Sequence, residues 1–61
     1  MIRVLIVDDS LLICRILASI ISADPELTVA GVAQSGEQAI ALTQALKPDL
    51  ITMDVFLGSM D

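Results

Sequence analysis

IRVLIVDDS, residues 2–10, carries the strongest structural signal in the chain. Its aliphatic run, Ile2–Val7, is interrupted only by Arg3, which is typical of a strand buried on both faces. The run stops at two adjacent acids, Asp8 and Asp9. Because a strand covered on both faces needs helices on each side of its sheet, this stretch favours a parallel α/β fold.

A helix is predicted over residues 10–22, which are apolar except for one narrow stripe formed by Arg15, Ser19 and Ser22. Such a helix needs cover on more than one side. Asp24 and Pro25 then supply a turn. The valine-rich run Leu27–Ala33 follows, and we predict that it forms a second strand.

A second helix is predicted to begin at Gly36, because the preceding serine and a glutamine three residues later have the spacing of a capping box. It ends before Lys47, since the proline that follows disfavours helical geometry in the residue before it. We expect five of its residues to face the core: Ala39, Ile40, Leu42, Ala45 and Leu46. A third strand is predicted over Asp49–Val55, with Met53 packed in the core.

Strand, helix, strand, helix, strand with short connections indicates a parallel sheet with right-handed crossovers. Two strand orders are compatible with this pattern. In the order 2-1-3 the helices lie on opposite faces, and a switch point opens at the carboxyl ends of strands 1 and 3. We therefore expect an α/β fold with a βαβαβ unit, and if the order is 2-1-3 we expect any functional residues at the switch point.

Composition excludes several classes of protein. The 61 residues allow one small domain, and a single cysteine with no histidine provides neither a disulfide nor the usual zinc ligands. The net charge of -5 has the wrong sign for nucleic acid or an anionic membrane surface, so we expect neither as a partner of this segment. We expect no transmembrane segment and no secretory signal, and we place the chain in the cytoplasm.

The acids at the strand ends are the candidate site. In the order 2-1-3, Asp8 and Asp9 meet Asp54, which lies near the end of the third strand. Carboxylates held close together repel, and a hard divalent cation such as Mg²⁺ relieves that repulsion. On spacing alone, a helix cap without any metal is an equally compatible role for Asp8 and Asp9, and Asp54 is also compatible with a plain polar strand end.

Three motifs, VLIVDDS, SGEQAI and KPDLITMDV, are similar in order and spacing to the first half of response-regulator receiver domains. IRVLIVDDS and DPELTVAGVAQSGEQAI most resemble the receiver of chemotaxis protein-glutamate methylesterases. The resemblance implies the βαβαβ half of a doubly wound flavodoxin-like parallel sheet with strand order 2-1-3. It implies that Asp8, Asp9 and Asp54 help to hold Mg²⁺ and that Asp54 accepts a phosphoryl group from a histidine kinase. It also implies that the backbone carbonyl of Phe56 is the remaining protein ligand of the metal.

The sequence also departs from that family. Leu57 and Gly58 stand where members usually have Met-Pro. The family's serine or threonine after strand 4 and its lysine after strand 5 have no counterpart here. We therefore expect a partial receiver domain over 1–61 that lacks strands 4 and 5. We expect it to be a phospho-acceptor domain and not itself an enzyme, and to belong to a methylesterase if the chain continues. Lys47 cannot replace that lysine, because it precedes the third strand and would lie at the opposite edge.

A second hypothesis comes from a different class of function. A truncated half-fold would perform no phosphoryl chemistry, and would instead self-associate or bind another chain through the uncovered edge of its third strand. Residues Leu50–Met53 contain neither lysine nor proline, the residues that usually protect such an edge.

Overall fold

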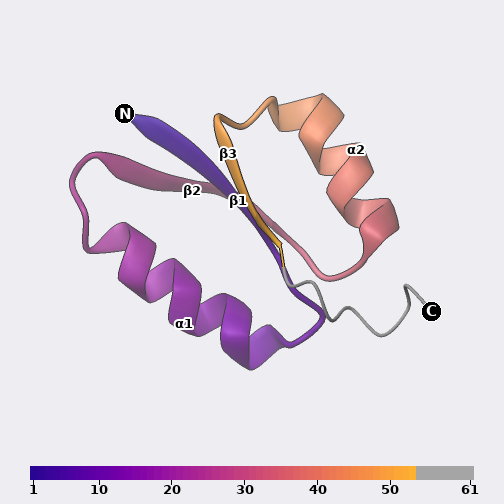
Figure 1. The fold of residues 1–61 in the computed structure, drawn as a ribbon, viewed down its shortest axis with the longest axis horizontal. Coiled ribbons are helices and arrows are strands. Elements are labelled where there is room, and N and C mark those ends of the chain that lie inside the picture. Colours follow the sequence, from indigo (N-terminus) through magenta and orange to yellow (C-terminus); the bar gives the residue numbers. More distant parts are fainter. Residues whose placement is uncertain (54–61) are drawn as a thin grey trace.

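The structure is a computed structural model and describes residues 1–53. Five elements alternate along the chain: β1 (Ile2–Val7), α1 (Leu11–Ser22), β2 (Leu27–Ala33), α2 (Gly36–Leu46) and β3 (Leu50–Met53). The three strands form one parallel sheet in the order β2-β1-β3, and α1 and α2 lie on opposite sides of it (Figure 1). The predicted α/β class and strand order are confirmed. The predictions for Asp54 to Gly58, including the last two residues of the expected third strand, lie outside the described residues.

The core is built on both faces of β1, as its continuous aliphatic run predicted. Val4 and Ile6 pack with Cys14 and Ile21 of α1, and each of these four residues is buried. On the other face, Leu5 and Val7 pack with Ala33 and Ala39, where α2 covers the sheet. Alternate residues of the central strand therefore hold the two helices on opposite faces.

One glycine allows α2 to approach the sheet closely. The register between β1 and β2 shifts between Val4 and Leu5, so that Leu5 is paired with Gly31. A Cβ atom on Gly31 would lie only 2.7 Å from Cδ1 of Leu46. The missing side chain of Gly31 therefore leaves the space that the last residue of α2 occupies.

The ends of α2 follow the sequence signals. The hydroxyl of Ser35 accepts a hydrogen bond of 3.1 Å from the backbone nitrogen of Gln38, so the predicted serine cap is present. The amide oxygen of Gln38 reaches back to the backbone nitrogen of Gln34, at 2.8 Å, rather than to that of the cap. The helix ends at Leu46, and Lys47 has a left-handed conformation with φ 48°.

Three of the residues expected in the core are exposed instead. Met53 is 57% exposed and Ile40 is 64% exposed, and Ala45 also faces solvent. The cause for Met53 is that both helices pack on β1 and β2, while the backbone of neither helix lies close to β3 within residues 1–53. Ile40 and Ala45 lie on either side of the stripe of α2 that packs on the sheet, and solvent reaches both side chains.

The outer surface of α1 remains apolar and open, which agrees with the prediction that this helix needs further cover. Leu12 and Ile20 are 66% and 63% exposed. Across residues 1–53, no helix has the length and apolar character needed to cross a membrane.

Candidate functional site

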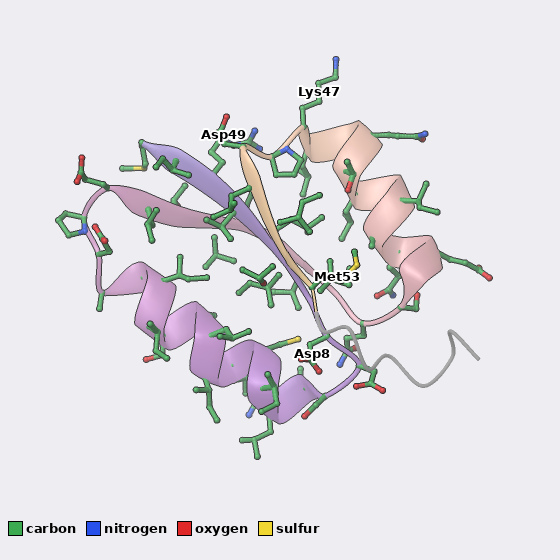
Figure 2. The ribbon with its side chains drawn as sticks, in the orientation of Figure 1. Asp8, Lys47, Asp49 and Met53 are labelled. Carbon is green, nitrogen blue, oxygen red and sulfur yellow. The ribbon has the colours of Figure 1, made fainter. Side chains whose placement is uncertain are left out.

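The carboxyl edge of the sheet brings together the ends of all three strands. Asp8 follows β1 directly, and its backbone nitrogen donates a 3.0 Å hydrogen bond to the carbonyl of Ala33, the last residue of β2. On the other side of β1, Val7 is paired with Met53, the last described residue of β3. Figure 2 shows Asp8 and Met53 at one end of the sheet, with Lys47 and Asp49 at the other. Asp8 therefore lies at the switch point of the sheet, where the sequence placed it.

Asp8 is buried and held in place by its neighbours. It is 6% exposed, and it is the one charged residue that the described part of the chain buries. Oδ1 of its carboxylate accepts a 2.9 Å hydrogen bond from the backbone nitrogen of Ser10. Its backbone carbonyl accepts a hydrogen bond from Sγ of Cys14, at 3.4 Å. Because its nitrogen is also bonded to β2, the whole residue is fixed by the surrounding backbone and by α1.

Asp9 differs from its neighbour because its side chain is exposed. The acid pair thus combines one buried carboxylate with one that solvent reaches. A single peptide, formed by the carbonyl of Asp8 and the nitrogen of Asp9, joins them. The orientation of that peptide sets how the two carboxylates lie relative to each other.

Neither acid caps the first helix. Ser10 occupies the N-cap position of α1, and its hydroxyl accepts a 3.3 Å hydrogen bond from the backbone nitrogen of Ile13. Asp8 instead bonds the nitrogen two residues further on, which is the geometry of an Asx turn. The alternative in which Asp8 and Asp9 serve only as the helix cap is therefore wrong, and Ser10 has that role.

Cys14 lies directly beneath the turn that carries the acids. It is 2% exposed and packs among the aliphatic residues between α1 and the sheet, as the sequence predicted. Burial, with the nearby charge of Asp8, raises the pKa of its thiol above the ordinary value. The thiol therefore remains protonated near neutral pH. Its bond to Asp8 was not foreseen, although helical side chains lean toward the N-terminus and so bring this position back to the strand end.

The donor set suits a hard divalent cation. Of the two oxygens of the Asp8 carboxylate, Oδ1 accepts a hydrogen bond and Oδ2 accepts none from the described residues, which leaves Oδ2 available to a ligand. Carboxylate oxygens are the ligands that Mg²⁺ prefers. Residues 1–53 alone contain no cluster of three or more acidic, cysteine or histidine side chains. Asp54 and Phe56 lie beyond the described part of the chain, so their convergence with Asp8 and Asp9 stays a prediction.

Lys47 lies far from this edge. It caps the C-terminus of α2 just before β3 begins, and Figure 2 shows it at the end of the sheet opposite Asp8. A side chain at that position cannot reach a phosphoryl group beside Asp8. The expectation that Lys47 does not replace the family's lysine agrees with this placement.

The fold is a parallel α/β sheet with helices on both faces, and two adjacent acids lie at its switch point. Small domains of this class perform their chemistry with carboxylates at the carboxyl edge of the sheet. A family model described as "Response regulator receiver domain" matches residues 4–61. The chain belongs to that family.

Similar proteins indicate which receiver domains this chain most resembles. A protein-glutamate methylesterase/protein-glutamine glutaminase of Syntrophus aciditrophicus is 52% identical over all 61 residues, which make up 17% of that protein. A relative of the same name from Pyrococcus abyssi is 47% identical over 60 residues, 98% of this chain and 16% of its own. The crystal structure of the response regulator domain of Thermotoga maritima CheB matches with a TM-score of 0.88 and 45% identity, over 90% of this chain and 41% of that one. The receiver of the chemotaxis methylesterases is therefore the group that this chain resembles, as its motifs indicated.

These relatives correct one expectation. We expected the chain not to be an enzyme, yet the relatives it matches are named as methylesterases and glutaminases, which are enzymes. The chain spans about a sixth of their length, at 17% of the first relative. The expectation rested on the receiver motifs of residues 1–61, and a methylesterase was expected only if the chain continued beyond them.

Proposed function

We propose that this chain is the amino-terminal half of a receiver domain that accepts a phosphoryl group on Asp54 from a histidine kinase in chemotaxis signalling. The observation that carries the proposal is the match of the receiver-domain family to residues 4–61. The position of Asp8 at the carboxyl edge supports it, because receiver chemistry requires acids there. We place this function in the cytoplasm, where a free thiol such as that of Cys14 is usual.

Mg²⁺ is the proposed cofactor. Asp8, Asp9, Asp54 and the backbone carbonyl of Phe56 would hold it, and when bound it neutralises negative charge on the phosphoryl oxygens. The buried and fixed carboxylate of Asp8 supports this assignment, since a preorganised carboxylate with a free oxygen lowers the reorganisation that metal binding requires. Asp9 is exposed to solvent, so its carboxylate is accessible to the ion.

The proposed reaction is a single phosphoryl transfer. A carboxylate oxygen of Asp54 attacks phosphorus, so that a P–O bond forms while the P–N bond to the donor histidine breaks. The imidazole leaves with the electron pair of that bond and takes up a proton. The product is an aspartyl phosphate.

We propose that residues 1–61 supply strands 1 to 3 of the receiver and that strands 4 and 5 are absent from them. The extent of the structural match supports this, because the chain covers 41% of the solved response regulator domain. The hydroxyl and the lysine that the family places after strands 4 and 5 are then also absent. Since removing one preorganised charge donor costs about 10²-fold or more in rate, we expect these residues alone to be phosphorylated poorly.

Metal binding and labelling test the proposal in turn. Titrating MgCl₂ into the chain should shift the backbone amide signals of Asp9, Asp54 and Phe56 together, and Asp9→Asn should weaken that response. Asp24→Asn is the matched control, since Asp24 is an exposed acid in the turn before β2, at the other end of the sheet. If several millimolar Mg²⁺ shifts none of these signals in a folded sample, the metal assignment fails.

Labelling with a small phosphodonor tests the acceptor. The complete receiver should be labelled in the presence of Mg²⁺, and Asp54→Ala should abolish the label. The 61-residue chain should be labelled at least about 100-fold more slowly, because the two charge donors are absent. Label retained in Asp54→Ala would overturn the assignment of the acceptor, and rapid labelling of the 61-residue chain would overturn the role given to the absent strands.

A second candidate function is self-association, favoured by the exposure of β3. Three apolar side chains of β3 are exposed: Leu50 (51%), Ile51 (39%) and Met53 (57%). The backbone of neither helix lies close to this strand within residues 1–53. An apolar strand with a free edge pairs readily with another strand. Sedimentation over a concentration series should show a dimer or larger species, which Ile51→Lys should dissociate. Ile40→Lys on the outer side of α2 should not, and a concentration-independent monomer would rule this candidate out.

A further inference from the structure

Cys14 is bonded to both ends of the turn that joins β1 to α1. Its backbone nitrogen donates a 3.0 Å hydrogen bond to the carbonyl of Ser10, where the turn ends. Its thiol donates to the carbonyl of Asp8, where the turn begins, with Sγ at 3.4 Å from the oxygen. The turn between these two points contains Asp9. One helical residue therefore closes the turn that carries both acids.

The carbonyl that the thiol contacts belongs to the peptide between Asp8 and Asp9. Rotation of this peptide would change the direction in which the chain leaves Asp8, and so would move Asp9. The other contacts of Asp8, from its nitrogen to Ala33 and from Ser10 to its carboxylate, do not restrain that rotation at the carbonyl. Among the described residues, the Cys14 thiol is the group that bonds this oxygen.

We propose that Cys14 is a positioning residue for the divalent cation site, because its thiol fixes the peptide that joins the two acids. The inference rests on the proposed function, since it assumes that Asp8 and Asp9 bind Mg²⁺. Cys14 itself does not touch the metal. It acts through the carbonyl of Asp8, in the way that outer-shell hydrogen bonds orient the ligands of other metal sites.

The chemistry of the side chain suits this role. The thiol is 2% exposed, so water does not compete for the carbonyl. A thiol is a weak donor, and its loss should therefore weaken binding by less than the full loss of an outer-shell partner. Without the donor, the Asp8 carbonyl would remain buried and unpaired, and the peptide could turn to find water.

The test compares three variants of the 61-residue chain by calorimetric titration with MgCl₂. Cys14→Val keeps a side chain of similar volume and removes the donor, and it should raise the Mg²⁺ dissociation constant about threefold to tenfold. Cys14→Ser keeps a donor and should stay within about twofold of the wild type. Ile21→Val is the control, because it trims the same apolar cluster at the far end of α1 and should leave the dissociation constant unchanged.

Circular dichroism melts of the same samples separate positioning from general loss of stability. The proposal is overturned if Cys14→Val binds Mg²⁺ as the wild type does, or if Ile21→Val weakens binding as much as Cys14→Val at a similar melting temperature. Equal weakening by Cys14→Val and Cys14→Ser would also overturn it, since packing and not the donor would then be responsible. Should Cys14→Val fail to fold, Cys14→Ala takes its place.

The wild type separates failure of the proposed function from failure of this inference. A wild type that binds no Mg²⁺ overturns the metal assignment of the proposed function and this inference with it. Wild-type binding with unaffected variants overturns this inference alone.

Discussion

The guanidinium group of Arg3 donates a 2.6 Å hydrogen bond to the carbonyl oxygen of Leu46, the last residue of α2. A second bond, of 3.2 Å, reaches the carbonyl of Lys47. The carbonyls at the end of a helix have no partners within the helix and carry partial negative charge, so a cation stabilises them. The one charged residue of β1 thus ties the start of the central strand to the end of α2, at the edge opposite Asp8.

Replacing this arginine should loosen that connection. Arg3→Met keeps the aliphatic stem and removes the guanidinium, and it should lower the free energy of unfolding by about 1–2 kcal/mol, since it removes charge-assisted bonds that are partly screened by solvent. Urea unfolding followed by circular dichroism measures the change. Arg15→Met is the matched control, because Arg15 is exposed on α1 and its loss should change stability by less than about 0.5 kcal/mol. Equal losses in the two variants would contradict the capping role of Arg3.

The contact between Gly31 and Leu46 gives a second prediction. Gly31→Val would place a Cβ atom 2.7 Å from Cδ1 of Leu46, so either the Leu46 side chain must change its conformation or α2 must shift, and we expect a loss of about 1–2 kcal/mol in the free energy of unfolding. Leu46→Ala removes the atom that clashes. In that background the cost of Gly31→Val should fall by about 1 kcal/mol, because the two positions are directly coupled. Additive losses would show that Gly31 is required for the backbone of β2 and not for the approach of α2.

The sequence predicted the strands and the serine cap of α2 because each depends on local pattern. The strand order is also as expected, but the local pattern left two orders open and the resemblance to receiver domains favoured this one. The continuous aliphatic run of β1 fixes burial on both faces, and a serine three residues before Gln38 fixes the start of a helix. The exposure of Met53 and Ile40 could not be predicted in this way. Periodicity shows which apolar residues share one face of an element. Burial depends on where the helices pack on the sheet, and here both helices pack on β1 and β2.

The position of Asp8 at the carboxyl edge of the sheet was predictable from the sequence, but the hydrogen bonds that hold Asp8 in place were not. Two adjacent acids after a buried strand indicate a carboxyl-edge site, and Asp8 lies at that edge. The contact from Cys14 was missed, because a cysteine in an apolar helix gives no sign of a polar partner. Its position, one turn after the Ser10 cap, is the signal that was present, since a side chain there leans back toward the strand end.

Alkaline pH should destabilise the fold through Cys14. Burial raises the pKa of its thiol in the folded chain, so the unfolded chain releases the thiol proton at a lower pH than the folded chain does. The stabilising effect of the protonated, buried thiol is therefore complete below the unfolded pKa of about 8.5 and is lost as pH rises through the folded pKa. Melting temperatures from pH 7 to pH 10.5 should fall above about pH 8.5 in the wild type and fall less in Cys14→Val. Parallel curves would show that the thiol does not govern alkaline stability.

Two threonines should respond in opposite directions to the same substitution. The hydroxyl of Thr52 in β3 is buried and has no hydrogen-bond partner among the described residues, whereas the hydroxyl of Thr43 in α2 donates to the carbonyl of Ala39 at 2.6 Å. Valine has nearly the same shape as threonine and lacks the hydroxyl, so Thr52→Val removes an unpaired buried group and should raise the free energy of unfolding by about 1 kcal/mol. Thr43→Val removes a hydrogen bond and leaves the β-branched shape of the side chain unchanged, and it should lower that free energy by about 0.5–1.5 kcal/mol. Urea unfolding of both variants at one protein concentration decides the matter: a loss of stability in Thr52→Val would mean that this hydroxyl has a partner in solution, such as a water molecule or a neighbouring chain bound at β3.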